Sequence, residues 1–276
     1  MKKAFLSLLT IAALVMSGCG KDDVKVNPDN PNNPDKPDVP VTGEYQSLKG
    51  SNYFPMLLDE TAAAMIKNKT VTDLFVNDFT DDAHYNGWIN LWIWENTVAA
   101  AEAMGPNFYG NLGYLAFTVT GDTWFGFAPA ISYNTTIVGV ERGGTKIHAS
   151  QSEMTTAAKN AIAKMAVIDA TYNFHFALKS QRNGIYRVIL YDGVKEASIT
   201  IGTSANDGTD YYFTRNGEWA EFDIPMSRFI AQGLNYANIV ANTTASQGLN
   251  IWAVSQGDIL PSDVNIDAVF FYQPAK

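Results

Sequence analysis

Beyond position 43, apolar and polar residues alternate over many short runs, as in β-strands whose two faces meet different surroundings. The runs are rich in Val, Ile, Phe, Tyr and Trp, and turn-forming Asn-Gly and Asp-Gly pairs separate several of them. The predicted strands are 73–78, 87–94, 112–120, 172–179, 186–191, 197–202, 219–224, 249–254 and 268–272. Many short strands with turns between them predict a mostly β fold, an antiparallel β-sandwich of the jelly-roll type.

Two segments have a helical pattern. Residues 60–67 are rich in alanine, and residues 152–167 carry apolar side chains at helical spacing after Ser152 near the N-cap. We expect both helices to be short and to pack on the sandwich.

The strand 88–94 has one aliphatic and one aromatic face. The aliphatic face, which we expect to lie on the core, consists of Ile89, Leu91 and Ile93. The opposite face consists of Trp88, Asn90, Trp92 and Trp94. Indoles are costly to expose unless something flat and partly apolar covers them, and the C–H face of a sugar ring is such a partner. This face predicts a carbohydrate-binding sheet, and the alternative is a second protein layer that buries the indoles.

Two further strands carry polar or aromatic groups opposite their expected core face. In 172–179 these are Asn173, His175 and Lys179, and in 249–254 they are Asn250 and Trp252. We predict that the strands 88–94 and 249–254 share one sheet, with indoles stacking on sugar rings and the polar side chains binding hydroxyls. A solvated outer face is the alternative for 172–179. If the helix 152–167 covers the tryptophans, the site lies elsewhere, near Trp124 or Tyr109.

The N-terminus has the pattern of a secretory signal peptide. Two lysines precede an apolar run at 4–16, and small residues then lead to Cys19, the one cysteine of the chain. Residues 16–19 resemble the bacterial lipobox, which implies a signal peptide at 1–18 and lipidation of Cys19. Residues 20–23 (Gly-Lys-Asp-Asp) resemble the export signal of Bacteroidetes surface lipoproteins, which implies an outer-membrane protein exposed at the cell surface.

The segment 19–42 is predicted to be a tether. Proline recurs every third residue from position 28 to position 40, interleaved with Asn and Asp. Such a segment buries little apolar surface and stays extended, while the proline stiffens it. The remaining residues, 43–276, are enough for one large β domain.

Charge and cysteine content exclude several classes of function. The chain has 19 basic and 28 acidic residues, a net charge of −9, and its lysines and arginines do not cluster. We therefore expect no nucleic-acid partner, and membrane contact through the lipid alone. Because no cysteine remains in the folded part, neither disulfides nor a thiol nucleophile is expected.

The stretch 211–229 resembles a recurrent segment of jelly-roll carbohydrate-binding modules of the galactose-binding-like type. In it an aromatic, a Gly turn and a Trp-x-x-x-x-Ile-Pro-x-Ser-x-Phe run occur together, and residues 264–271 resemble the last strand of that fold. In that family the tryptophan, here Trp219, is usually structural. With the anchor and tether, the chain resembles the surface glycan-binding lipoproteins of Bacteroidetes polysaccharide-utilisation systems related to the starch system. The resemblance implies non-catalytic capture of a polysaccharide or oligosaccharide beside an outer-membrane sugar transporter and companion lipoproteins.

Three alternatives stay open. Modules of this kind often hold a structural Ca²⁺, for which Asp78 and Asp267 are candidate ligands, although no calcium-loop spacing is present. No other cofactor is expected. A glycosidase would need paired carboxylates, and Glu221 and Asp223 lie on one strand face. A structural subunit of a surface assembly is the third alternative. We expect a binding protein rather than an enzyme.

Overall fold

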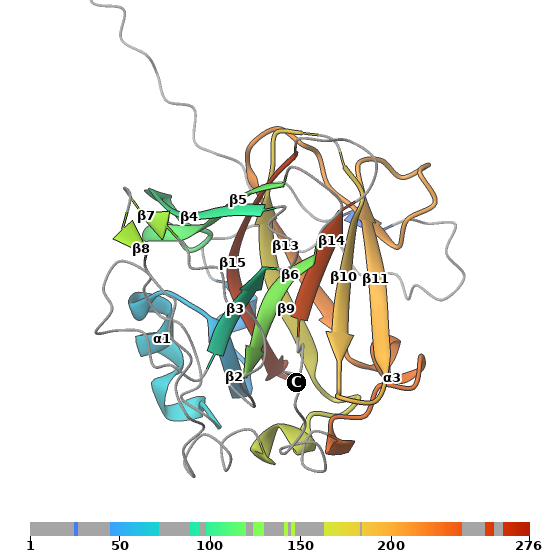
Figure 1. Cartoon of the computed structure of the whole chain (residues 1–276). Coiled ribbons are helices and arrows are strands. Elements are labelled where there is room, and N and C mark those ends of the chain that lie inside the picture. The colour runs from blue at the N-terminus through green and yellow to red at the C-terminus, as the bar shows by residue number, and fades with distance from the viewer. Residues whose placement is uncertain are drawn as a thin grey trace, which may run out of the picture.

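The computed structural model describes residues 25–26, 45–71, 89–93, 98–119, 124–129, 141–142, 145–146, 163–182, 184–238, 252–256 and 262–276. Its strands form two sheets that face each other (Figure 1). The six-stranded sheet contains, in order, β13 (Trp219–Pro225), β9 (Asn173–Lys179), β15 (Ser262–Gln273), β5 (Leu112–Val119) and β4 (Val98–Pro106), with β2 (Ser51–Leu57) also paired to β15.

The seven-stranded sheet faces it. Its order is β1 (Lys25–Val26), β12 (Tyr211–Tyr212), β11 (Glu196–Gly202), β10 (Tyr186–Tyr191), β14 (Trp252–Gln256), β6 (Trp124–Pro129) and β3 (Ile89–Ile93). A small hairpin joins β7 (Glu141–Arg142) to β8 (Thr145–Lys146). Among these named strands, all pairs are antiparallel except β11 with β12. The predicted fold class, a mostly β antiparallel sandwich of the jelly-roll type, is confirmed.

Short helices flank the sheets. They are η1 (Gln46–Leu48), α1 (Glu60–Ile66), η2 (Lys67–Lys69), η3 (Met165–Val167) and α3 (Ser227–Ile230). Asp59 starts α1, because its Oδ1 accepts hydrogen bonds from the backbone N–H groups of Thr61 and Ala62. The predicted helix at 60–67 is thus confirmed. Of the helix predicted at 152–167, residues 152–162 lie outside the described part, and the rest ends in η3.

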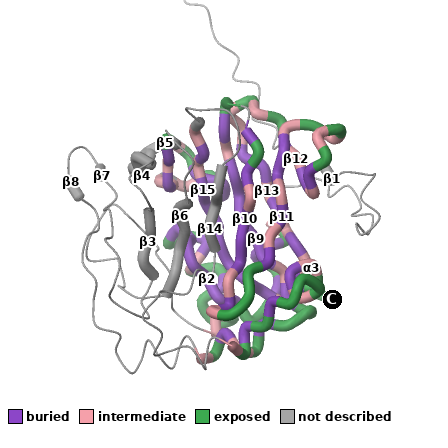
Figure 2. Tube along the Cα trace, turned by 45° about the vertical axis from the view of Figure 1, so that its right-hand side comes forward, coloured by how far each residue is buried: buried purple, intermediate pink, exposed green. Residues whose placement is uncertain are grey.

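A first hydrophobic cluster fills the space between the sheets. The six-stranded sheet contributes alternate residues such as Phe174 and Phe176 of β9, and the seven-stranded sheet contributes Val188 and Leu190 of β10. Figure 2 shows buried residues running along β9, β10, β11 and β13 through the middle of the molecule. This cluster accounts for the sandwich by burial alone, as expected for a fold without disulfides.

A second hydrophobic cluster lies on the other side of the six-stranded sheet. It joins residues of η1, α1 and the loop after β4 to outer-face residues of β9, β13 and β15, and consists of Leu48, Tyr53, Leu58, Ala62, Ile66, Phe108, Tyr109, Ala177, Trp219, Ala268, Phe270 and Tyr272. In Figure 1, α1 lies against the flank of the sandwich beside β2. The N-terminal part of the domain therefore covers much of this face.

Some predictions concern residues whose placement is not described. The strand predicted at 73–78 and the prolines at 28–40 lie outside the described residues. Within the predicted tether, Lys25–Val26 pair with β12 at the end of the seven-stranded sheet. None of the helices in the described ranges has the length and apolar character needed to cross a membrane.

Candidate functional site

The tryptophan-rich run forms β3 at the end of the seven-stranded sheet. β6 lies between β3 and β14, pairing antiparallel with both. The prediction that the strands 88–94 and 249–254 share one sheet is therefore confirmed, with one strand between them.

The register shows which positions share a face, because directly paired residues of a sheet lie on the same side. Val188, in the core between the sheets, pairs with Val254, which pairs with Phe125, which pairs with Ile93. Ile89, Leu91 and Ile93 therefore occupy core-side positions, as predicted. Asn90 and Trp92 occupy the alternate positions, on the outer face of the seven-stranded sheet.

The prediction for Trp252 is wrong. Trp252 pairs with Phe127, which pairs with Leu91, so its position belongs to the core-side rows. Trp92 pairs with Gly126, which pairs with Ala253. The sequence pattern assigned Ala253 to the core side, but its other neighbour is Ile189, outside the cluster between the sheets. Apolar residues at every position of 251–254 leave the register undetermined from sequence.

Trp124 joins the outer face in place of Trp252. It begins β6, and its row continues through Ser255 and Arg187 to Thr200. Two residues further along β6, Gly126 belongs to the adjacent row, which contains Trp92. Sequence reasoning placed Trp124 near a loop, although the alternation of Phe125 and Phe127 was a signal for a strand. The outer face thus has two indole positions beside a polar strip, which consists of Arg187, Glu196, Ser198, Thr200 and Ser255.

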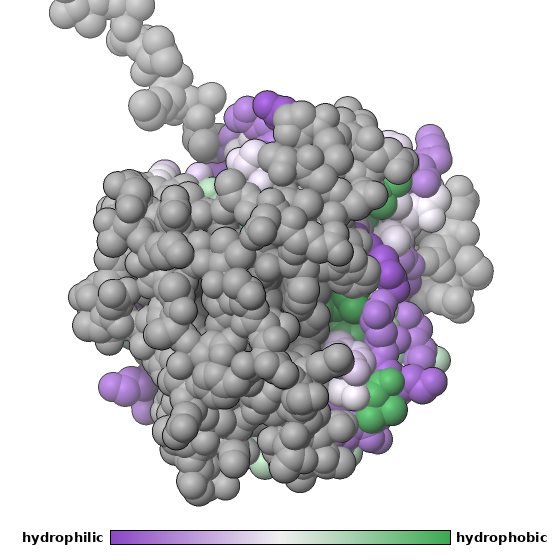
Figure 3. Space-filling model, in the orientation of Figure 1, coloured by the Kyte–Doolittle hydropathy of each residue, from purple (hydrophilic) through white to green (hydrophobic). Residues whose placement is uncertain are grey.

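The side chains of that polar strip are held in place. Arg187 forms an ion pair with Glu196, and both side chains are over 40% exposed, at 43% and 42%. The Nε of Arg187 also donates to Ser198 Oγ at 3.1 Å. In Figure 3, hydrophilic residues gather on the right-hand flank, where Figure 1 places β11. Fixed donors and acceptors at an exposed surface are what recognition of hydroxyl groups requires.

Side chains protect the part of the β11 edge that β12 does not pair with. Gln232 pairs with the backbone of Ser198, accepting from its N–H at 3.0 Å and donating to its carbonyl at 2.9 Å. Asp210 Oδ2 accepts from both the N–H and the hydroxyl of Thr200. Asp210 also forms an ion pair with Arg228 at 2.9 Å. These contacts block edge-to-edge pairing and order the polar strip.

His175 is buried, and the prediction that it faces a ligand is wrong. It is 0% exposed in the second cluster, where its ring stacks on Phe270 with centroids 4.3 Å apart. Its Nδ1 lies 2.7 Å from the carbonyl oxygen of Ala268, and its Nε2 lies 2.9 Å from Glu221 Oε1. The N-terminal cover over this face, which the alternation within β9 does not reveal, is the physical reason.

Asn173 and Lys179 lie at opposite ends of β9, on the six-stranded sheet. Both are half-buried, and neither belongs to the sheet of Trp92. Lys179 lies over the rings of Tyr114 and Trp219. The structure therefore separates these two predicted hydrogen-bonding residues from the indole positions.

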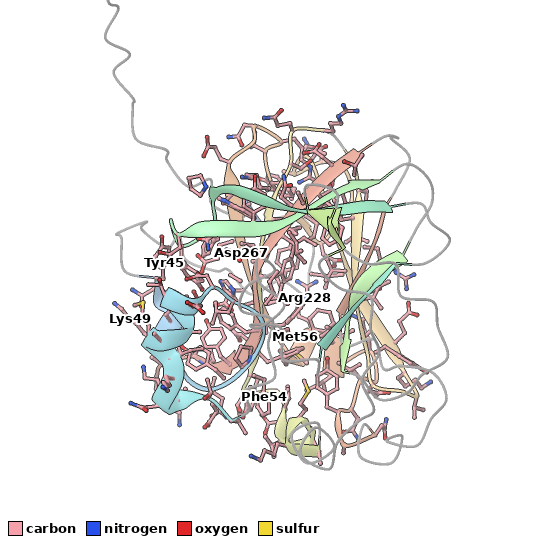
Figure 4. All side chains as sticks on the ribbon, turned by 60° about the vertical axis from the view of Figure 1, so that its left-hand side comes forward. Tyr45, Lys49, Phe54, Met56, Arg228 and Asp267 are labelled. Atoms are coloured by element: carbon pink, nitrogen blue, oxygen red, sulfur yellow. The ribbon has the colours of Figure 1, made fainter. Side chains whose placement is uncertain are left out.

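Asp267 is buried, and its Oδ2 accepts from the N–H of Phe108 at 2.9 Å. Its assignment as a calcium ligand stays a prediction. Burial, the largest cause, raises the pKa of its carboxyl to about 7. In Figure 4, Asp267 lies near Tyr45, whose hydroxyl donates to the carbonyl of Phe108. Within the described ranges no three acidic, histidine or cysteine side chains form a metal-binding group.

The other predicted site residues cannot be placed. Trp88, Trp94, Asn250, Asp78 and Cys19 lie outside the described residues. Trp88 and Trp94 directly flank β3.

The paired acids of the glycosidase alternative are engaged in structural contacts. Glu221 bonds to His175, and Asp223 accepts from the hydroxyl of Tyr272 at 2.6 Å. Asp192, an acid that directly follows β10, is buried and accepts hydrogen bonds from the backbone N–H groups of Val194 and Lys195. No pair of these carboxylates stands free to flank a glycosidic bond.

Comparison with known proteins finds only remote structural similarity. No family model matches the chain, and no curated protein matches it. Among solved structures, the chain is similar to the family 11 carbohydrate-binding module of a cellulosomal cellulase of Clostridium thermocellum, at 12% identity and a TM-score of 0.35, covering 72% of this chain and 95% of that one.

Two further modules give similar values. The family 30 carbohydrate-binding module of another Clostridium thermocellum cellulase has 12% identity and a TM-score of 0.35, with 68% of this chain and 94% of that one covered. A family 29 module from Piromyces equi has 9% identity and a TM-score of 0.29, with 68% and 82% covered. These TM-scores and identities are too low to support a function, so the function must be argued from this chain's own residues.

Proposed function

We propose that the protein binds a polysaccharide or oligosaccharide, without cleaving it, across the outer face of the seven-stranded sheet. The observation that carries this proposal is the register, which gives Trp92 and Trp124 outer-face positions in rows that lead to Arg187 and Ser198. Indoles supply flat apolar surface for sugar rings, while the polar strip supplies hydrogen bonds to hydroxyl groups.

The absence of free paired acids among the described residues supports binding over hydrolysis. Glu221 and Asp223 are used by the second cluster, and the acid on the outer face, Glu196, is paired with Arg187. A retaining or inverting glycosidase requires two carboxylates about 5–10 Å apart around the bond that breaks. Carboxylates that are all engaged in protein contacts favour binding of a saccharide over its hydrolysis.

We further propose that the protein captures the glycan at the cell surface and passes it to an outer-membrane transporter. The sequence 16–19, with Cys19 as lipid acceptor, and the export-like residues 20–23 support this location. Weak binding at a single site is compensated when many tethered copies raise the local concentration. Labelling with a fatty-acid probe, lost on Cys19→Ala, combined with protease shaving of intact cells, tests the location.

Affinity electrophoresis tests the binding proposal. The protein is run through gels that each hold one neutral polysaccharide: starch, mannan, levan, laminarin or a neutral xylan. We expect retardation by one of them, and its loss in Trp92→Ala and Trp124→Ala, since losing one stacking indole costs about 1–3 kcal/mol of binding free energy. Retardation that persists in both variants would place binding elsewhere, and shortened glycan in the gel would indicate cleavage.

Matched variants separate stacking from folding. Trp92→Phe keeps a ring at the same position, so we expect it to retain most of the retardation that Trp92→Ala loses. Thermal unfolding of both variants should match that of the unsubstituted protein. If a variant loses retardation and its melting temperature also falls by several degrees, the loss of binding is not evidence for stacking. That result would also contradict an exposed position for Trp92.

A further inference from the structure

Lys179 is a half-buried cation on the outer face of the six-stranded sheet. Its Nζ lies 3.9 Å from the ring centroid of Tyr114 and 4.7 Å from that of Trp219. The two rings meet edge to face, with centroids 5.1 Å apart. Attraction between an ammonium group and aromatic faces holds the charge in one place.

The ring beneath Lys179 is itself fixed. Trp219 is 8% exposed, and its Nε1 donates to the carbonyl of Pro106 at 3.2 Å. Trp219 also belongs to the second hydrophobic cluster. Lys179 therefore rests on a rigid support, which reduces the entropy lost when its ammonium group binds a partner.

The ammonium group of Lys179 has no acidic partner among the described residues. The neighbouring carboxylates are engaged elsewhere: Glu221 bonds to His175 Nε2, and Asp263 accepts from the N–H of Gln181 and the hydroxyl of Ser180. A half-buried cation over aromatic rings, with its N–H groups unmatched in the described structure, favours an anionic acceptor from outside.

The sheet row that contains Lys179 carries an amide. The row of Lys179 continues through Asn265 to Ala116 and Ala101, and the next row pairs the exposed Thr118 with Asp263, whose carboxylate bonds to Gln181 and Ser180. Asn265 Nδ2 donates to the carbonyl of Lys179 at 3.1 Å.

We propose that the Lys179 surface, made of Lys179, Tyr114, Trp219, Asn265 and Ala116, binds the anionic group of an acidic sugar, with a uronic-acid carboxylate as its ligand. The proposal takes only the saccharide class from the proposed function, because its residues lie on the opposite sheet from Trp92 and Trp124. The sandwich would then have two saccharide sites. The site at Trp92 and Trp124 would bind neutral sugars, and the Lys179 surface would bind sugars that carry a carboxylate.

Titration calorimetry of the full chain with three galactose-based oligosaccharides tests this proposal. Trigalacturonate carries carboxylates, a carrageenan tetrasaccharide carries sulfates, and galactotriose is neutral. We expect trigalacturonate to bind. Its affinity should fall at least tenfold in Lys179→Gln. It should also fall at least tenfold when NaCl is raised from 50 to 500 mM, because salt screens the contact between the ammonium group and the carboxylate. Binding of the sulfated sugar alone would overturn the carboxylate assignment.

Three variants make the outcome specific. Lys67→Gln removes an exposed lysine of η2 and changes the net charge equally, so it should leave trigalacturonate binding unchanged. Trp92→Ala should also leave it unchanged, while Tyr114→Leu should weaken it. The proposal is overturned if Lys179→Gln binds like the unsubstituted protein, if no acidic sugar binds, or if Trp92→Ala abolishes the same binding. The gel test with Trp92 and Trp124 judges the first site separately.

Discussion

The outer faces of the two sheets have similar sequence patterns and different surroundings. On β9 the alternate residue His175 is buried beneath η1, α1 and the loop after β4, with its ring nitrogens beside acceptors. On β10 the alternate residue Arg187 stays 43% exposed in an ion pair, whereas Ile189, in the row of Trp92, is buried. A polar residue on the non-core side of a strand is therefore a candidate for ligand binding only when no further layer of the chain covers it.

The largest difference between the faces should appear on removing His175. His175→Ala deletes a fully buried stacked ring and leaves the Ala268 carbonyl without its partner. We expect the free energy of unfolding in urea to fall by about 3–5 kcal/mol. Arg187→Ala, the equivalent change on the exposed face, should alter it by less than about 1 kcal/mol. Equal losses for the two variants would contradict the contrast between the faces.

Asp267 should give the covered face a distinctive pH dependence. Burial raises the pKa of its carboxyl to about 7 from the ordinary 3.8, so the folded protein keeps a proton that the unfolded chain loses. The stability that this group contributes is fully present below about pH 4 and is lost as the pH rises to about 7.

Asp267→Asn should remove this dependence. The stability of the variant relative to the unsubstituted protein should increase across that window by up to roughly 4 kcal/mol, since each pKa unit corresponds to about 1.4 kcal/mol. Unfolding midpoints of both proteins at pH 4, 5.5 and 7.5 measure it. A difference that does not change with pH would mean that the carboxyl is charged throughout.

A smaller effect tests the cover itself. Asp59 caps α1 and accepts from Asn111 Nδ2 at 2.7 Å, which ties the helix to the loop after β4. Asp59→Ala should cost about 1–2 kcal/mol of unfolding free energy. Asp59→Ser keeps a cap and should recover part of the loss. If both substitutions leave urea unfolding unchanged, the cap contributes nothing to this face.

The smallest effect is expected on the exposed face. Arg187→Gln keeps a donor near Ser198 but breaks the ion pair with Glu196. We expect saccharide affinity to fall by about 1 kcal/mol, with the melting temperature unchanged. Affinity electrophoresis against the retarding glycan checks this, and a loss larger than that of Trp92→Ala and Trp124→Ala would make Arg187 the main anchor in place of the indoles.

Strand alternation predicted much of the fold, and the reasons for the failures are physical. β10 has the predicted bounds, and β9 and β13 differ by one residue at one end, because large apolar residues occupy every second position of each strand in the sequence, even though β9 is buried at five successive positions. β2 was missed because its residues from Tyr53 onward are buried at successive positions, on both faces of the strand. Large apolar side chains at adjacent positions, such as Tyr53 and Phe54, leave β2 without the alternation in sequence that β9 has.

The candidate site was predicted only in part for the same reason. Trp92 was placed correctly because its neighbours Leu91 and Ile93 are aliphatic and alternate with it. The Trp252 position was assigned to the wrong face because the residues around it are all apolar, and a register shift of one residue moves every side chain across the sheet. The burial of His175 depends on contacts distant in sequence, such as those of Phe108, which no local pattern contains.

The most direct test of the account is a crystal structure of the protein with the neutral oligosaccharide that corresponds to the retarding glycan. The account predicts that its rings lie across β3, β6 and β14, in contact with Trp92 and Trp124, with hydroxyl groups bonded to Arg187 or Ser198. An oligosaccharide bound elsewhere, with both indoles free of ligand, would contradict it.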